Sequence, residues 1–469
     1  MKLPIFSPHR KGVSDDLNPA RLLNMFYEVD LQNKSQIGFL QCPGYSLKCN
    51  LGTSGIRGGI VFQGYLYIVH YNELWKIDTT FSVRTVVGNL TTFYDNVSMA
   101  ENGVQLMIVD GPAGYIWDGT TFQRITDPDF TGADFVQFKD GYFIFNIIPN
   151  TGKVAISAAY DGLNYDALDY KTAEGAPDEL RAIVADQEWL WNFGRYTTEL
   201  WYNAGSTFPF QRAQNGVLQW GIVAPWSAVS ADNSVVWLGN NRDGEAVVLR
   251  ASGPGSPTII STKGMAHELG KMSKIDDAEG FAYMLQGDIF YQLSFPTAER
   301  TFVYQFSVKE WFERNRFAGG RHRARNHVYF EQARTHVIGD YANGNLYALE
   351  PDTYTDNGER ILKEIDSRIL NKDNKRLFHN SLILDCETGV GNTDDTDPKV
   401  EMMYSDDNGR IYSAFLERSL GPKGHYADPP RWNRLGSAVN RVYKFRCAAK
   451  SRFRVFGAYG DYDVGDADQ

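Results

Sequence analysis

The sequence is poor in the features that mark several common protein classes. Its 469 residues include only four cysteines, Cys42, Cys49, Cys386 and Cys447. They are too few for a disulfide scaffold of this size and fit no metal-ligand spacing, so we expect a reducing compartment. Methionine (9 residues) is scarce beside tyrosine (26) and phenylalanine (28), a balance that favours strands over helices.

Long hydrophobic runs and an excess of positive charge are also missing. The longest apolar run, Tyr142–Ile148, is far too short to span a bilayer. The first eight residues lack an apolar core of signal-peptide length, so we expect no secretion signal and no membrane insertion. The formal net charge of −10 argues against a protein whose whole surface grips nucleic acid. It is compatible with an acidic surface past which DNA slides.

Motifs of catalysis and cofactor binding are absent from the sequence. There is no Walker-type loop, no Gly-x-Ser-x-Gly elbow, no His-Glu-x-x-His and no Rossmann fingerprint after a strand. His322 and His327 stand in a basic loop, but no cysteine and few acids accompany them, which gives metal binding little support. We therefore predict that the chain is not an enzyme and has no catalytic, cofactor-binding or metal site.

What the chain does contain is a repeated hairpin. Between Gly59 and Asn146, an apolar-alternating run, a polar turn and a second alternating run occur three times. The turn glycines Gly64, Gly103 and Gly141 are 38–39 residues apart, a spacing in the range of a four-stranded propeller blade. Asn-Gly and Asp-Gly between alternating runs are strong hairpin signals, because such turns need a positive φ.

Looser copies of the hairpin follow, and they predict an all-β chain whose main part is a β-propeller of six or seven blades. These copies occupy segments 181–194, 227–239, 279–291 and 328–349. A propeller often completes one blade with a strand from the far end of the chain. The extended segments 21–28 and 38–42 are candidates for that role, with a plain surface arm as the alternative.

The spacing of the hairpins changes after residue 350, where turn-rich acidic loops precede a new set of alternating runs. We interpret the last part as a smaller β-sandwich-like domain, with a modified final blade as the alternative. The predicted organisation is an N-terminal arm with a candidate blade-closing strand over residues 1–50, a β-propeller over 51–355 and a C-terminal β domain over 356–469.

Two basic stretches are candidate contact surfaces. One belongs to a run that includes Lys309 and Arg314, and the other is an amphipathic strand near the C-terminus. A solvated surface is the alternative for both, but complementary charge between subunits favours a partner chain for the second. The candidate subunit or adaptor contacts are Arg316, Arg321, Arg323, Arg325, Arg452 and Arg454.

Two features suggest carbohydrate chemistry. Residues 405–412 resemble the Asp-box hairpin of sialidases, with Tyr412 where that motif carries Trp; a stabilised surface hairpin is the favoured interpretation. Six tryptophans gather between Trp189 and Trp237, which suits a sugar platform but is more typical of core packing. The alternative function is therefore a glycan-binding or glycan-cleaving propeller, sialidase-like or lyase-like.

One family resemblance runs through the chain. Segment 189–210 resembles the packaged-DNA stabilisation proteins of short-tailed bacteriophages (podoviruses), also described as tail nozzle or tail hub proteins. Segments 221–227, 23–44 and 405–445 fit the same family pattern at lower density.

The resemblance implies a structural virion protein that acts in the tail and is assembled in the host cytoplasm. It implies a homo-oligomer, a hexameric ring below the portal and its tail adaptor, that continues the DNA channel and retains packaged DNA. Double-stranded DNA would pass without sequence-specific binding, and tail fibre, spike or plug proteins would attach. A third interpretation, a cellular propeller scaffold that binds peptides, predicts a monomer instead.

Overall fold

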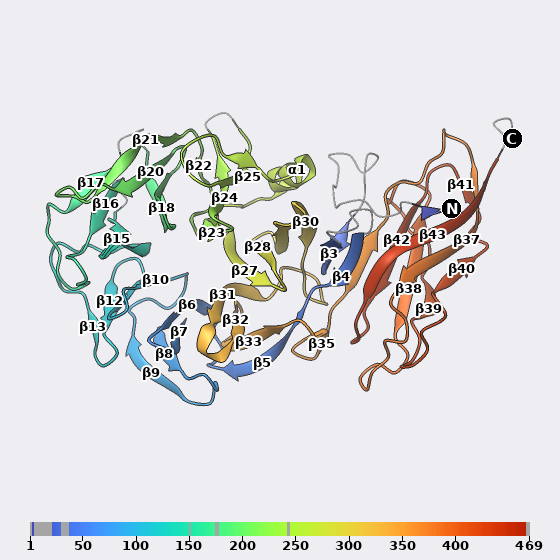
Figure 1. The fold of residues 1–469 in the computed structure, drawn as a ribbon, viewed down its shortest axis with the longest axis horizontal. Helices are drawn as coiled ribbons and strands as arrows, with labels where there is room; N and C mark the ends of the chain where they lie inside the picture. Colours follow the sequence, from blue (N-terminus) through green and yellow to red (C-terminus); the bar gives the residue numbers. More distant parts are fainter. Residues whose placement is uncertain are drawn as a thin grey trace.

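Strands account for nearly all of the regular structure. The computed structural model describes residues 2–3, 21–29, 37–149, 152–173, 178–241 and 244–465. Figure 1 shows two lobes, a ring of small sheets and a sandwich of longer strands. Within the described residues, α1 (Lys263–Lys271) is the only α-helix, and no helix there has the length and apolar character that a bilayer crossing needs.

The first three blades of the ring are four-stranded antiparallel sheets in chain order. Their strands are β6 (Ile56–Phe62), β7 (Tyr65–His70), β8 (Glu73–Ile77) and β9 (Arg84–Asn89); β10 (Ser98–Glu101), β11 (Leu106–Val109), β12 (Gly114–Trp117) and β13 (Phe122–Arg124); and β14 (Val136–Lys139), β15 (Tyr142–Asn146), β16 (Lys153–Ile156) and β17 (Tyr170–Thr172). The repeat glycines Gly64, Gly103 and Gly141 have φ values of 78°, 86° and 93°, so the predicted turns are confirmed.

The next two blades contain an interruption. Blade four comprises β18 (Leu180–Ala185), β19 (Leu190–Gly194), β20 (Thr198–Asn203) and β21 (Phe210–Leu218). Blade five comprises β22 (Gly221–Ile222), the 3-10 helix η1 (Pro225–Ser227), β23 (Val229–Ala231), β24 (Ser234–Asn240), β25 (Val247–Ala251) and β26 (Thr258–Ile259). Both β22 and β23 pair with β24, so the turn at Pro225 splits the inner strand into two pieces.

The last two blades bring the count in the described residues to seven. Blade six comprises β27 (Glu279–Leu285), β28 (Asp288–Phe295), β29 (Arg300–Gln305) and β30 (Glu310–Glu313); blade seven comprises β31 (Ala324–Phe330), the 3-10 helix η2 (Glu331–Ala333), β32 (Thr335–Asp340), β33 (Asn345–Glu350) and β5 (Gly44–Asn50). The first strands of successive blades pack side by side, and β31 packs against β6. The ring is therefore closed, and the prediction of an all-β propeller with a β-sandwich is confirmed.

The N-terminal strand β5 completes blade seven. It pairs antiparallel with β33, with Leu47 opposite Tyr347. The assignment of a closing role to segments 21–28 and 38–42 was wrong, because they form β2 (Leu22–Leu23), β3 (Met25–Val29) and β4 (Ile37–Gln41). Strand β2 lies beside the outer strand of blade six, which already has four strands of its own, and β3 and β4 belong to the sandwich. Leu22, Met25, Phe26, Phe39 and Leu40 are buried in the cluster that the sandwich shares with blades six and seven.

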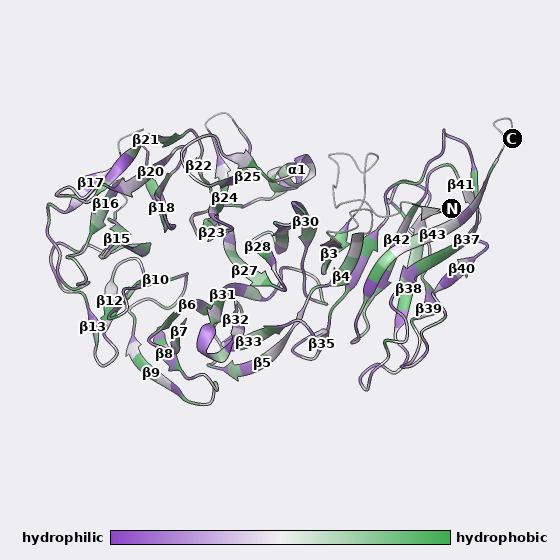
Figure 2. Ribbon diagram, in the orientation of Figure 1, coloured by the Kyte–Doolittle hydropathy of each residue, from purple (hydrophilic) through white to green (hydrophobic). Residues whose placement is uncertain are grey.

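The second lobe is a sandwich of two sheets. One contains β3, β4, β1 (Lys2–Leu3), β37 (Leu377–Cys386), β40 (Arg431–Asn433), β41 (Ser437–Ala438) and β43 (Arg454–Val464). The other contains β2, β36 (Lys363–Asp366), β38 (Lys399–Ser405), β39 (Leu416–Ser419) and β42 (Val442–Cys447). Two short strands, β34 (Thr355–Asp356) and β35 (Glu359–Arg360), extend blade seven towards it. Figure 2 shows hydrophobic residues concentrated on the strands of both lobes.

The two lobes share a sheet. Strand β2 pairs in parallel with β30 and antiparallel with β36, so blade six continues into the sandwich as one nine-stranded sheet. Phe290 and Phe312 of blade six belong to the same buried cluster as Met402 and Phe445 of the sandwich. Burial of each such side chain contributes roughly 1.5–3 kcal/mol. Backbone pairing and a common core therefore fix the lobes to each other.

Asn24 holds this junction together. Its side chain is buried, and its Nδ2 donates to Asn315 Oδ1 (2.8 Å) and to the Leu362 carbonyl (2.9 Å). Its backbone N–H donates to the Glu313 carbonyl, and its own carbonyl accepts from the Cys42 N–H. The φ of 52° lies in the left-handed region that asparagine tolerates better than most residues. One residue thus links blade six, the start of the sandwich and the N-terminal strands.

We expect Asn24→Ala to lower the free energy of unfolding by about 2–4 kcal/mol, because several buried polar groups lose their partner. Urea denaturation followed by tryptophan fluorescence measures this change. Asn357→Ala is the matched control, since Asn357 also has a positive φ (51°) but is exposed, and its cost should stay near 1 kcal/mol. Equal losses for the two variants would contradict a linking role for Asn24.

Candidate contact surfaces and grooves

The basic segment from Arg316 to Arg325 connects blades six and seven, and two of its arginines meet Glu279 on β27. Arg325 Nη2 lies 3.0 Å from Glu279 Oε1, and Arg321 Nη1 lies 3.8 Å from Glu279 Oε2. Asn96, from the loop between blades one and two, donates to Glu279 Oε1 (2.9 Å). The buried carboxylate of Glu279 therefore joins blade six to blade seven and to the loop that begins blade two.

The other two predicted contact arginines of this segment are also ion-paired within the chain. Arg316 Nη2 lies 3.7 Å from Glu299 Oε2. Arg323 Nη2 lies 3.0 Å from Glu359 Oε2, and its Nη1 lies 3.6 Å from Asp340 Oδ2. These pairs orient the arginines along the seam between blades six and seven. Contacts of this segment with another subunit stay a prediction.

Arg314, which the sequence places in the same basic run, lies inside the protein. Its Nη2 donates to the Pro43 carbonyl (3.0 Å), and its guanidinium carbon lies 5.5 Å from the centre of the Tyr45 ring. Tyr45 OH lies 2.9 Å from His322 Nε2. Burial raises the pKa of Asp356 to about 6, although the nearby Arg314 charge pulls it down. A charged cluster is thus buried where β5 closes the ring.

His322 and His327 face different partners. His327 Nε2 lies 2.9 Å from His336 Nδ1, and the two rings stack at 5.2 Å. Burial, together with the neighbouring His336, lowers the pKa of His327 to about 3. Across the part of the chain that the structure describes, no three His, Cys, Asp or Glu residues are grouped to hold a metal ion.

Arg452 and Arg454 lie at the sandwich side of the junction. Both pair with Glu387, Arg454 through Nε at 3.8 Å. With side chains 41% and 37% exposed, they are the most exposed of the six predicted contact arginines. Arg452 also lines a groove of about 690 Å³ together with Tyr354 and Tyr426. These two arginines are the best placed of the six to meet another molecule.

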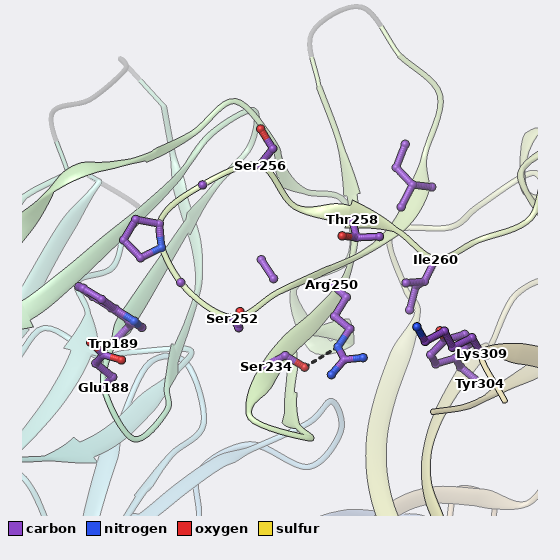
Figure 3. Close-up of a pocket in the computed structure, with 15 residues that line it drawn as sticks. Glu188, Trp189, Ser234, Arg250, Ser252, Ser256, Thr258, Ile260, Tyr304 and Lys309 are labelled. Atoms are coloured by element: carbon purple, nitrogen blue, oxygen red, sulfur yellow. Dashed lines mark hydrogen bonds between the residues drawn. The ribbon is translucent and has the colours of Figure 1, made fainter. Parts of the chain in front are cut away.

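A second groove, of about 660 Å³, opens between blades four, five and six. Figure 3 shows Glu188 and Trp189 on one side and Tyr304 and Lys309 on the other, with Arg250 between them. The β25–β26 loop, residues 252–256, forms a further wall, and Ser234, Ala251 and residues 258–260 also line the groove. In the sequence, Trp189 stands out only as part of a tryptophan cluster, and Arg250 does not stand out at all, because nothing in the sequence places these separate turns together.

The other carbohydrate-related features have structural roles. Trp191, Trp201 and Trp237 are at most 1% exposed, in line with the packing interpretation. In the segment that resembles an Asp-box, Asp407 Oδ1 accepts from the backbone N–H groups of Arg410 (3.0 Å) and Ile411 (2.8 Å). Asp407 therefore stabilises its own turn, as the favoured interpretation expected.

Comparison with known proteins gave matches for both lobes. The family model described as Bacteriophage P22 Gp10, beta-propeller, matches residues 1–354, and that described as Bacteriophage P22 Gp10, beta-sandwich, matches residues 363–460. A search of curated proteins gave no significant match. Among solved structures, YCF48 from Cyanidioschyzon merolae is similar over 66% of this chain and 99% of its own, with 12% sequence identity and a TM-score of 0.42.

We expect Glu279→Gln to lower the free energy of unfolding by about 2–4 kcal/mol, because Arg321 and Arg325 lose a largely buried counter-charge. Glu299→Gln is the control. Glu299 also faces Arg316 and Arg321, but its side chain is 50% exposed, so the loss should stay below about 1 kcal/mol. Chemical denaturation of both variants in parallel measures the two losses, and a larger loss for the Glu299 variant would refute the linking role of Glu279.

We expect acid to destabilise the fold through His327. Because its pKa is lowered in the folded state, the unfolded chain takes up the proton first, and stability falls as the pH drops below about 6.5 towards 3. His327→Gln removes this term, so between pH 6.5 and 5 the variant should lose about 1–2 kcal/mol less than the wild type.

Denaturation curves at several pH values measure this difference. At pH 8 His327 is neutral in both the folded and the unfolded chain, so the stability difference between variant and wild type at that pH gives the effect of the substitution on packing alone. Parallel pH profiles of the two proteins would show that His327 does not contribute.

Proposed function

The chain belongs to the bacteriophage P22 Gp10 family and is a structural protein of the phage tail, and on that basis we propose that it forms the tail nozzle. In this proposal, copies of the chain assemble into a hexameric ring below the portal and its tail adaptor. The ring continues the DNA channel, retains packaged DNA and carries fibre, spike or plug proteins. Assembly takes place in the host cytoplasm.

The observation that carries the proposal is the shared sheet. A channel wall must keep its shape under load, and here blade six and the sandwich are one nine-stranded sheet with a continuous core. Bending the lobes apart would break backbone hydrogen bonds and expose apolar surface. Domains joined only by a flexible linker would instead be expected to move relative to each other.

The net charge of −10 supports passage of DNA rather than its capture. Fixed negative charge on a wall repels phosphates within about 10 Å at moderate salt, so the duplex would slide without binding a particular sequence.

For contacts to a neighbouring subunit or to the adaptor, we propose Arg452 and Arg454 first. They share a single carboxylate, Glu387, so the group keeps one excess positive charge for a partner. Arg316 is a further candidate at 30% exposure. Arg321, Arg323 and Arg325 are more committed to intrachain pairs and would contribute mainly by shaping the seam beside such a contact.

Negative-stain microscopy of the purified chain tests the nozzle proposal: we expect closed six-fold rings with an opening wide enough for a DNA duplex. The double variant Arg452→Glu/Arg454→Glu should shift the protein to smaller species in analytical ultracentrifugation. Lys372→Glu/Arg376→Glu, on exposed residues of the same lobe, is the control and should keep the rings. A monomeric wild type would refute the nozzle proposal. Intact rings of the first variant would show only that Arg452 and Arg454 do not make the contact between subunits.

A further inference from the structure

The groove between blades four, five and six has a cationic side that the tail role does not explain. Arg250 is fixed in place, because its Nε donates to Ser234 Oγ (2.8 Å) and its Nη2 to Asp232 Oδ2 (2.6 Å). Its guanidinium carbon also lies 4.8 Å from the centre of the Phe306 ring. Among the described residues, no partner takes the remaining nitrogen Nη1, so a rigid donor is left for a ligand.

Lys309 and Tyr304 add to this cationic side. Both come from blade six and line the groove, and Figure 3 shows them on the opposite side of Arg250 from Glu188 and Trp189. Lys309 lies in the β29–β30 turn with a φ of 58°, and no acidic side chain in the described ranges pairs with its ammonium group. Guanidinium, ammonium and phenol groups together form a donor set suited to a carboxylate or phosphate.

The rest of the groove suits a polar, ring-shaped ligand. Glu188 and Trp189 stand opposite the cations in Figure 3. A carboxylate accepts hydrogen bonds from hydroxyl groups, and an indole face packs against the C–H groups of a ring. The loop between them carries further hydroxyls, and those that line the groove belong to Ser252, Ser256 and Thr258.

The second groove, on the sandwich, has a similar volume but a different balance of charge. Its arginine, Arg452, is already paired with Glu387. In the groove of blades four to six, the Nη2 of Arg250 is paired with Asp232, but its Nη1 and the ammonium group of Lys309 have no carboxylate partner among the described residues. The sandwich groove also has a lysine, Lys423, but its lining contains no carboxylate and no indole that could face a sugar ring.

We propose that the groove of blades four to six binds an acidic oligosaccharide. Its carboxylate or phosphate group accepts hydrogen bonds from Arg250 and Lys309, and a neighbouring sugar ring lies between Trp189 and Glu188. The proposal is independent of the nozzle, since a monomeric chain would hold the same groove.

Isothermal titration calorimetry tests the proposal with three probes: trigalacturonate for a carboxylate, mannose 6-phosphate for a phosphate, and maltotriose as the neutral reference. We expect one anionic probe to bind at least tenfold more tightly than maltotriose, and its affinity to fall with added salt. Whichever anionic probe binds identifies the charged group.

Variants locate the site. Lys309→Gln and Trp189→Ala should each weaken binding by roughly tenfold. Arg250→Lys, which keeps the charge but cannot keep both fixed contacts, should weaken it as well. Lys423→Gln is the matched control, because Lys423 lines the other groove, and it should bind like the wild type. Circular dichroism confirms that each variant is folded.

Three outcomes would overturn the proposal: no binding of either anionic probe at millimolar concentration, equal binding of neutral and anionic probes, or binding that Lys309→Gln leaves unchanged.

Discussion

Unpaired sheet edges are the constraint on which the rest of this structure depends. A ring of separate sheets leaves its outer strands with free N–H and C=O groups, and those groups need partners or cover. The residues before Ile56 provide both at two blades: β5 completes blade seven, and β2, only two residues long, lies between blade six and the sandwich. Closure of the ring and attachment of the second lobe are therefore achieved by one short stretch of chain, which couples the two lobes energetically.

Charged side chains are buried at these joints, and their main effect is to define how the parts fit together rather than to add stability. Arg314 and Asp356 lie beside the closing strand, and Glu279 lies where three parts of the ring meet. Desolvation offsets much of the attraction within a buried ion pair, so such a pair adds little net stability compared with apolar packing. It does penalise a wrong arrangement strongly, because any shift leaves a charge without its partner. We infer that these groups specify how the seams fit, while the shared apolar core provides most of the stabilisation.

Local patterns in the sequence predicted the local structure well, but they did not predict which distant segments pair with each other. The spaced glycines identified the hairpins because a positive φ is a property of one residue and its neighbours. The closing strand was misplaced because 21–28, 38–42 and 44–50 are all short extended segments, and only their pairing partners distinguish them. Strand β5 pairs with β33, about 300 residues away, whereas β3 and β4 pair with each other. The six arginines were visible as a basic pattern, but their acidic partners were not. Glu279, for example, pairs with Arg321 and Arg325 only because separate turns meet in space.

The division of the buried residues into separate packing clusters shows how one chain can combine a stiff wall with a ligand groove. The core cluster that joins the lobes draws on blades six and seven and on the sandwich, whereas the buried residues of blades four and five belong to two other clusters, one shared with blade three and one with blade six. Turns of blades four and five are thus free of the junction, and the groove uses them together with the outer turn of blade six. Substitutions in those turns change a surface without disturbing the shared sheet. A propeller permits this arrangement because each blade is anchored by its inner strands, which leaves its turns open to carry recognition.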